Sequence, residues 1–269
     1  MNTKAEICKT KYPIILVHGT GTRDFRRRDS WGRIPEALRK AGAEVFYANQ
    51  DGWGTTAKNA ETVKESILAV LAKTGSEKVN IIALSKGGLE ARYMIHKLDM
   101  ENKVASLTTI STPHYGSKTM DFLCGRMKYF LKFAAIFINA IYKQRGDRQP
   151  DLYNVCRQFT SEYAKRFNKE IKNSGKVYYQ SYAGVMKKSY YDMILFIPHV
   201  FVKIFDGECD GLVSLESAKW GEFKGVISGR VIRGVSHSDL RDLRKVGPLG
   251  KIVVRAYIDM VSELREKGY

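Results

Sequence analysis

The chain has 269 residues, of which 44% are hydrophobic and 27% are charged. This length and composition can bury a sizeable core, so they exclude wholesale disorder and fit a globular chain. The net charge of +17 predicts attraction to anions, but the basic residues are spread out and the densest cluster, at 26–28, is only three arginines long. Because no RNA-binding or zinc-finger signature is present, we expect a basic surface and no nucleic-acid partner.

The spacing of the cysteines and the first residues of the chain indicate which cofactors and which cellular compartment to expect. None of the four cysteines stands in a CxxC pair, which argues against a zinc ribbon or redox pair, and we expect neither a metal nor another cofactor. Residues 1–6 lead into no apolar segment of the kind that a signal peptide needs. If the chain begins naturally at Met1, we expect it to be cytoplasmic; if a leader was trimmed, we expect a secreted protein.

Apolar runs alternate with helical patterns through the first 110 residues. The runs that have the continuous hydrophobicity of buried strands are 13–17, 44–48, 79–84 and 104–110. The stretches with helical spacing between them are 31–41, 56–74 and 87–98. This alternation predicts an α/β chain whose sheet is mainly parallel, with helices on both faces.

The regular alternation stops after Ser117. Residues 119–142 carry apolar side chains on more than one helical face, so one surface must meet something besides the core. A second helical stretch is expected at 153–172. We interpret 118–160 as a helical lid or cap inserted in a single domain of residues 1–269, which would cover the site in water and meet lipid when open. The plainer alternative is a buried helix pair.

The C-terminal part returns to mixed patterns. Strands are expected at 176–183 and 230–232, and 200–205 is a candidate strand or buried run. Residues 252–264 form an amphipathic helical pattern. The fold class therefore stays α/β to the end of the chain.

Ser85 lies between the run at 79–84 and the helix that follows. A nucleophilic serine on a sharp strand-to-helix turn needs small residues two before and two after it, and Ala83 and Gly87 meet that need. The helix start also favours developing negative charge. The segment resembles the G-x-S-x-G nucleophile elbow of α/β-hydrolases, with alanine for the first glycine. A serine that merely caps the helix is the plainer alternative.

The first expected strand ends in His18-Gly19-Thr20-Gly21. This resembles the H-G-x oxyanion loop of bacterial lipases, and the resemblance assigns the two backbone donors to Thr20 and Lys86. Each such donor contributes roughly 3 kcal/mol to stabilising a tetrahedral intermediate. We expect His18 to be structural and the Lys86 side chain to lie on the surface rather than to select anionic substrates. A plain tight turn is the alternative, since a P-loop would need a Gly-Lys-Ser/Thr that is absent.

The general base is expected among five histidines, and α/β-hydrolases order their triad Ser, Asp or Glu, His along the chain. His237, the last of them, is the candidate, and His199 is the weaker alternative. The D-G-L-V segment that begins at Asp210 resembles the D-G-[LV]-V of bacterial lipases, which favours Asp210 over Asp206 as the acid. Asp210 would fix the tautomer of the histidine and stabilise its imidazolium.

Further matches follow in the same order along the chain. They are S-T-P-H-Y-G-S at 111–117, F-T-S-E-Y at 159–163 and Y-Y-Q-S-Y at 178–182. On these motifs the chain is identified as a member of the α/β-hydrolase fold bacterial triacylglycerol lipase and esterase family. The resemblance implies an α/β-hydrolase fold with a lid, and cleavage of carboxylic, especially lipid acyl, esters through an acyl-enzyme.

Some members of this family bind metals, so we compared this sequence with their metal-ligand positions. Residues 19–84 contain no histidine or cysteine, so the zinc site of some relatives is not expected. Asp239 matches a calcium ligand of others, and Asp192 could be a second carboxylate, but Leu243 stands where a glutamine is expected. Calcium therefore stays open and no metal is predicted.

Three functions fit these residues. A lipase or carboxylesterase would have an ester or lipid as its partner and would contact a lipid interface transiently. An acyltransferase or amidase could use the same triad, since the sequence does not separate water from another acceptor. A non-catalytic lipid- or nucleic-acid-binding protein on this scaffold would need a broken triad, whereas every member is present.

Overall fold

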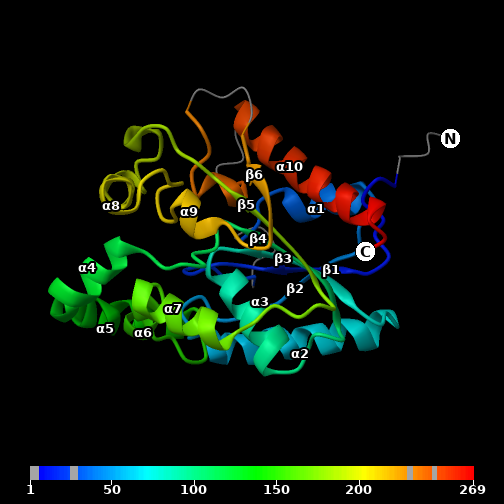
Figure 1. The fold of residues 1–269 in the computed structure, drawn as a ribbon, viewed down its shortest axis with the longest axis horizontal. Helices are drawn as coiled ribbons and strands as arrows, with labels where there is room; N and C mark the ends of the chain where they lie inside the picture. Colours follow the sequence, from blue (N-terminus) through cyan, green and yellow to red (C-terminus); the bar gives the residue numbers. More distant parts are fainter. Residues whose placement is uncertain (1–5, 25–29, 229–232, 244–246) are drawn as a thin grey trace.

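The computed structural model describes residues 6–24, 30–228, 233–243 and 247–269. Within these residues six strands form one sheet, in the order β2-β1-β3-β4-β5-β6 (Figure 1). The strands are β1 (Ile14–Val17), β2 (Val45–Tyr47), β3 (Val79–Leu84), β4 (Val104–Ile110), β5 (Tyr178–Ala183) and β6 (Glu222–Val226). Every neighbouring pair is parallel, which confirms the predicted sheet. The arginines at 26–28 and the strand expected at 230–232 lie outside the described residues.

Helices cover both faces of this sheet, as predicted. Helices α1 (Ile34–Lys40) and α10 (Gly247–Glu266) lie on one face, and α2 (Thr56–Thr74) and α3 (Lys86–Lys97) lie on the other (Figure 1). The chain moves across the sheet one way from β1 to β2 and the other way from β2 to β3 and β4. Because crossovers between parallel strands are right-handed, this reversal puts α1 on one face and α2 and α3 on the other.

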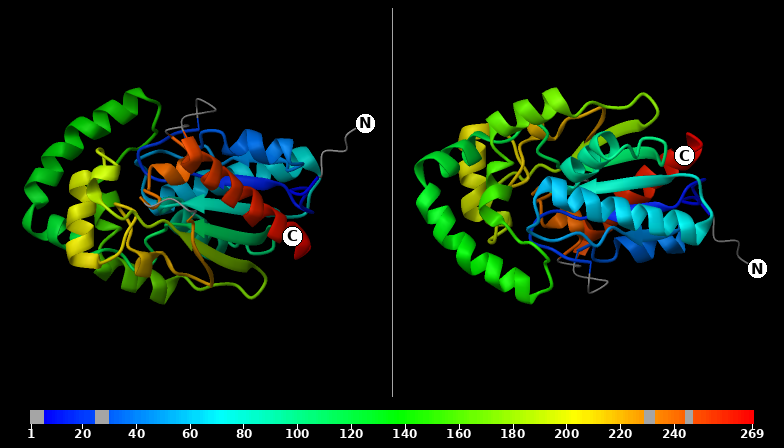
Figure 2. Two further views of the ribbon diagram at one scale, coloured as in Figure 1. Left: turned by 90° about the horizontal axis from the view of Figure 1, so that it is seen from above. Right: turned by 90° about the horizontal axis from the view of Figure 1, so that it is seen from below.

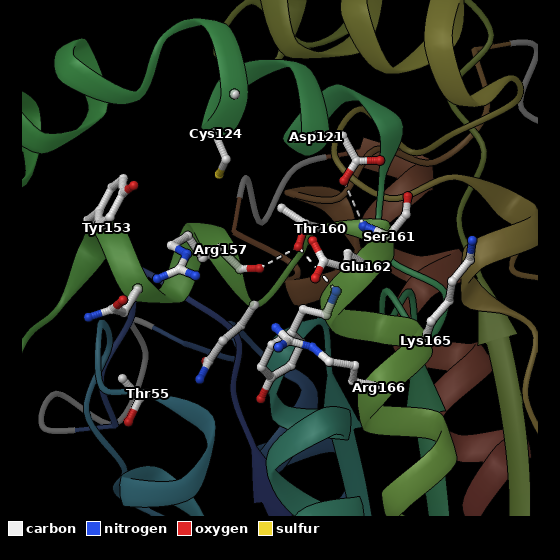
Figure 3. A pocket seen from close by; sticks show the side chains of 14 residues that line it. Thr55, Asp121, Cys124, Tyr153, Arg157, Thr160, Ser161, Glu162, Lys165 and Arg166 are labelled. Carbon is white, nitrogen blue, oxygen red and sulfur yellow. Dashed lines mark hydrogen bonds between the residues drawn. The ribbon is translucent and has the colours of Figure 1, made fainter.

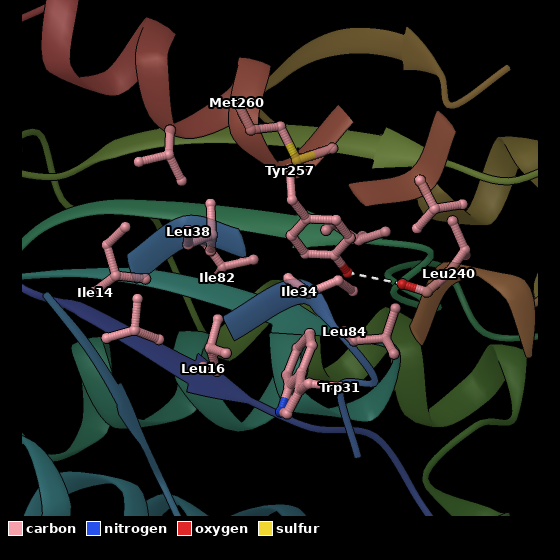
Figure 4. Packing of buried hydrophobic residues seen from close by; sticks show 14 of the residues in the cluster. Ile14, Leu16, Trp31, Ile34, Leu38, Ile82, Leu84, Leu240, Tyr257 and Met260 are labelled. Atoms are coloured by element: carbon pink, nitrogen blue, oxygen red, sulfur yellow. Dashed lines mark hydrogen bonds between the residues drawn. The ribbon is translucent and has the colours of Figure 1, made fainter. Parts of the chain in front are cut away.

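The two faces carry separate cores because successive strand residues point to opposite sides. On β1, Ile14 and Leu16 pack in one cluster, whereas Ile15 and Val17 pack in the other. Figure 4 shows the first cluster, in which the Tyr257 ring of α10 enters the core and its hydroxyl donates to the Leu240 carbonyl at 3.0 Å. The central strands are thus buried on both faces, which fixes the edge where their loops gather.

A group of helices departs from the sheet at one end of the molecule (Figure 2). These are α4 (Lys118–Arg126), α5 (Lys128–Gln144), α6 (Leu152–Arg157), α7 (Ser161–Glu170), η1 (Ser189–Tyr191) and α8 (Phe196–Asp206). Two short helices, α9 (Leu215–Ala218) and η2 (Asp239–Arg241), lie nearer the sheet. Within α5, all of whose residues are described, only Ala135 is buried, so a buried helix pair is ruled out.

Two sequence predictions for this region were wrong. The single helix expected at 153–172 is divided into α6 and α7, because Thr160 caps α7 by accepting from the Tyr163 amide at 3.3 Å. The candidate strand at 200–205 lies in α8. A short run of apolar and β-branched residues does not distinguish a strand from a helix. No helix in the described ranges has both the length and the hydrophobicity needed to cross a membrane.

Candidate active site

Ser85 occupies the turn between β3 and α3 with φ 55° and ψ −130°, in the left-handed half of backbone space. Such a conformation is strained for a residue with a side chain and persists only when the surroundings hold it. A Cβ on Gly87 would lie 2.5 Å from the Val17 carbonyl oxygen, and one on Gly19 would lie 2.8 Å from Ser85 Cβ. Glycine at both positions therefore lets the loop after β1 pass directly against the serine. Ser85 makes no side-chain capping hydrogen bond, so the helix-cap alternative finds no support.

Asp210 and His237 form a buried pair. Asp210 Oδ2 lies 2.6 Å from His237 Nδ1, and the carboxylate is fully buried. Its other oxygen, Oδ1, accepts from the amides of Leu212 at 3.0 Å and Val213 at 2.9 Å. An ionised carboxylate only accepts hydrogen bonds, so this contact places a proton on Nδ1 and leaves Nε2 as an acceptor. The D-G-L-V turn thus orients the acid through its own backbone.

Backbone contacts place Ser85 and this pair at one edge of the sheet. The Ser85 amide donates to the Ile110 carbonyl at 2.9 Å, where β4 ends. The next residue, Ser111, accepts from the Gly184 amide at 3.0 Å, and a Cβ on Gly184 would lie 3.2 Å from Asp210 Cβ. This is the carboxyl edge of the parallel strands, where open α/β sheets bind their ligands.

Ser85 and His237 form no hydrogen bond with each other in the structure. Among the described residues, neither Ser85 Oγ nor His237 Nε2 has a hydrogen-bond partner. Both residues keep a small exposed fraction, 6% for Ser85 and 8% for His237. The structure therefore brings the candidate acid and base into contact, and leaves the serine hydroxyl and Nε2 unpaired at the same edge.

The two candidate oxyanion donors flank the serine. Thr20 follows Gly19 in the loop that passes against Ser85, and Lys86 is the first residue of α3. The first amides of a helix have no partner within it. In the described ranges neither the Thr20 nor the Lys86 amide has an acceptor. Both ring nitrogens of His18 face backbone carbonyls, at 2.8 and 3.0 Å, so His18 holds this loop in place.

The Lys86 side chain is not on the surface, and that prediction was wrong. It is 1% exposed and pairs with Glu90, one turn along α3. Glu90 also accepts from Gln50 at 3.1 Å and from Asn59 at 2.7 Å. Because α3 packs against α2, position 86 points into the molecule even though it begins a helix. The Lys–Glu spacing of four residues was the signal that could have predicted this pair.

Replacing Lys86 with methionine should lower the free energy of unfolding by about 3–5 kcal/mol, because it leaves the Glu90 carboxylate buried without its cation. Lys40→Met is the matched control, since it removes the same kind of i,i+4 pair, with Glu36, from the exposed face of α1. Exposed pairs contribute little, so this control should change stability only slightly. Urea unfolding followed by circular dichroism measures both, and equal effects would contradict the prediction.

Asp206 lies elsewhere and serves another purpose. Its carboxylate accepts from Ser117 Oγ at 2.8 Å, from the Lys118 amide at 2.7 Å, and from the Thr119 amide and hydroxyl at 3.1 and 2.8 Å. It therefore ties the end of α8 to the start of α4, a contact that sequence reasoning missed. The ring nitrogens of the alternative base, His199, face Ser189 Oγ at 2.8 Å and a backbone carbonyl at 3.0 Å.

The two carboxylates considered for calcium share a serine. Ser236 Oγ donates to Asp192 at 2.7 Å and lies 2.9 Å from Asp239, and Arg233 Nη2 lies 3.2 Å from Asp239 Oδ1. The Arg233 guanidinium thus already compensates the charge of one of these carboxylates, whereas a calcium ion would need uncompensated negative charge there. The residues present do not fit a calcium site.

A polar cavity of about 860 Å³ opens between α4 and helices α6 and α7 (Figure 3). Tyr153, Arg157 and Arg166 line it, with Asp121 and Cys124 on the α4 side. Neither Ser85 nor the Asp210–His237 pair is among its described lining residues. The cavity is thus separate from the candidate active site.

Comparisons with known proteins agree with this fold. The alpha/beta hydrolase fold family matches residues 12–183. Triacylglycerol lipase 2 of Saccharomyces cerevisiae is 30% identical over 73% of this chain and 59% of its own length, and the triacylglycerol lipase of Pseudarthrobacter phenanthrenivorans is 33% identical over 62% and 56%. The chain therefore spans less than two thirds of the length of either relative.

Solved structures share the fold. The crystal structure of a Bacillus licheniformis lipase in its mature form superimposes with a TM-score of 0.68 at 19% identity, over 94% of this chain and 92% of that one. Identity this low shows the fold alone. Together with the family match, which covers more than half of the chain, it establishes that the chain belongs to the α/β-hydrolase fold family.

Proposed function

We propose that the chain is a serine hydrolase that cleaves carboxylic esters, and that lipid acyl esters are its substrates. The observation that carries this proposal is the buried Asp210–His237 contact at the sheet edge where the strained Ser85 stands. A serine that only caps a helix or stands in a plain turn would need neither a buried acid–histidine pair nearby nor a strained backbone. The similarity to triacylglycerol lipases over part of their length supports the choice of substrate class.

In the proposed mechanism Ser85 Oγ attacks the ester carbonyl while His237 Nε2 accepts the hydroxyl proton. The amides of Thr20 and Lys86 stabilise the oxyanion, and His237 returns the proton to the departing alcohol, which leaves an acyl group on Ser85. Asp210 keeps Nε2 free to accept and stabilises the imidazolium. Water then repeats the sequence and releases the acid. The Ser85–His237 hydrogen bond forms with substrate, since catalytic hydrogen bonds are often long in the free enzyme.

The substrate would reach this site past the helices at 118–160, which we propose as a lid or cap inserted within a single domain of residues 1–269. Its side chains would contact a lipid interface transiently during turnover. A basic surface without nucleic-acid motifs leaves an ester or lipid as the proposed partner.

A fluorophosphonate probe tests the nucleophile, because it forms a phosphorus–oxygen bond with an activated serine and releases fluoride. The expected result is one label per chain, located by mass spectrometry on the peptide that contains Ser85. No label, with a control hydrolase labelled normally, would reject the proposal. Product analysis with added alcohol then separates hydrolysis from acyl transfer, since a transferase would yield the new ester.

A further inference from the structure

We propose that Tyr142, at the end of α5, is a positioning residue for the Thr20 amide, a role that rests on the proposed function. The Tyr142 hydroxyl donates to the Gly21 carbonyl at 2.8 Å, across a separation of 121 residues in the chain. Gly21 directly follows Thr20. A side chain of the insertion at 118–160 therefore contacts the loop that we propose as one half of the oxyanion hole.

The Thr20 amide belongs to a peptide group whose other end is held in place. The Gly19 carbonyl of that group accepts from Thr22 Oγ1 at 3.1 Å and lies 2.8 Å from His18 Nδ1. Because a peptide group is planar, these contacts also fix the direction in which the Thr20 N–H points. Among the described residues this N–H has no acceptor, so it is left to donate to an oxyanion.

The residue after Thr20 is held on both sides. The Gly21 amide donates to the Gly52 carbonyl at 3.0 Å, and the Gly21 carbonyl accepts from Tyr142. A Cβ on Gly52 would lie 3.1 Å from Tyr142 Cε1, so glycine there lets the ring pack against the loop. Within the described ranges the Gly21 carbonyl accepts no other hydrogen bond. Removing the tyrosine hydroxyl should therefore loosen the loop directly beside the Thr20 amide.

The end of α5 is itself anchored beside this loop. Asp147, buried just beyond α5, accepts from the Gly52 amide at 3.1 Å, from the Trp53 amide at 2.9 Å and from Arg23 at 2.5 Å. The rings of Trp53 and Tyr142 meet edge to face, with centroids 6.1 Å apart. A fixed support thus presents the tyrosine hydroxyl to the loop, as a preorganised donor site requires.

Arg23 joins the loop to a second carboxylate. Its Nη1 lies 3.2 Å from Asp51 Oδ1, while Asp51 Oδ2 accepts from the amides of Arg148 and Gln149 at 2.8 and 2.9 Å. Because Arg23 closely follows Thr20 in the chain, its two ion pairs tie the oxyanion loop to the segment after β2 and to the insertion. The insertion therefore helps to build the proposed site as well as to cover it.

Tyr142→Phe keeps the ring and removes only the hydroxyl. The expected kcat for a soluble short-chain nitrophenyl ester is about tenfold lower, since a misplacement of about 1 Å at a reacting centre can cost roughly 100-fold. KM should stay within about twofold, because the donor acts on the transition state rather than on the bound ester. Hydrogen–deuterium exchange of the peptide that contains Gly21 should become faster, and this measurement needs no catalysis.

Tyr47→Phe is the matched control. Tyr47 is also half-buried, but its ring contacts the Arg39 guanidinium and its hydroxyl bonds to none of the described residues. Its kcat, KM and exchange near Gly21 should equal those of the parent. A parent without esterase activity would reject the proposed function, and the positioning role with it. An active parent whose Tyr142→Phe variant has an unchanged kcat, a loss confined to KM or unchanged exchange would overturn the positioning role alone. So would an equal loss of kcat in Tyr47→Phe.

Discussion

Replacing Ser85 with alanine is expected to lower kcat for a short-chain nitrophenyl ester by roughly 10⁴-fold or more, because no other group can form the acyl intermediate. The fold should persist: alanine matches the serine apart from the hydroxyl, which has no hydrogen-bond partner among the described residues. The strained backbone at φ 55° is set by Gly19 and Gly87 and their neighbours, not by the hydroxyl. Initial rates and thermal melting on the same preparation measure the two effects.

Ser111→Ala is the matched control for that experiment. Ser111 directly follows the neighbouring strand β4. It also has a positive φ, 44°, and is also buried, but its hydroxyl already accepts from the Gly184 amide. Losing that bond should reduce stability and leave most of the activity. If Ser85→Ala retained a substantial share of the rate, or if both variants lost activity equally, Ser85 would be a structural residue of the sheet edge.

The central strands could be predicted because burial on both faces leaves them almost wholly apolar. Ile14–Val17 and Val79–Leu84 have this form, and Gly75 marks the end of the helix that precedes the second of them. Residues 200–205 are equally apolar, yet they lie in α8 because water, not a neighbouring strand, faces much of that helix. Hydrophobicity alone therefore predicts a strand only where the surrounding fold buries it.

The candidate site likewise has features that could be predicted from the sequence and features that could not. The elbow, the loop at Gly19 and the D-G-L-V turn are local motifs, so their resemblance to motifs of bacterial lipases was enough to single out Ser85 and Asp210 as candidates. The partner of Asp206 is Ser117, 89 residues earlier, and no spacing rule reaches across that separation. The buried Lys86–Glu90 pair likewise involves Gln50 and Asn59, which donate to Glu90 from outside α3.

Asp210→Asn is expected to lower kcat roughly 10⁴-fold, because an amide in place of the carboxylate favours the wrong histidine tautomer. Oδ2 lies 2.6 Å from His237 Nδ1, while Oδ1 accepts from two backbone amides. Asparagine can keep its oxygen toward those amides only by turning its NH₂ group to the histidine. Nδ1 must then accept, so Nε2 carries the proton and no longer accepts one from serine. The short-ester assay used for Ser85 measures this loss.

Asp206→Asn distinguishes this mechanism from a general need for acidic residues in the segment. Asp206 contacts α4 and not the histidine, so its replacement should weaken four hydrogen bonds at the start of that helix. The expected loss is about 1–3 kcal/mol of stability, with kcat for a short ester largely retained. A large fall in kcat for Asp206→Asn with a normal rate for Asp210→Asn would reverse the two assignments. Measuring kcat and melting temperature for both variants thus shows which carboxylate serves the reaction and which holds the helices together.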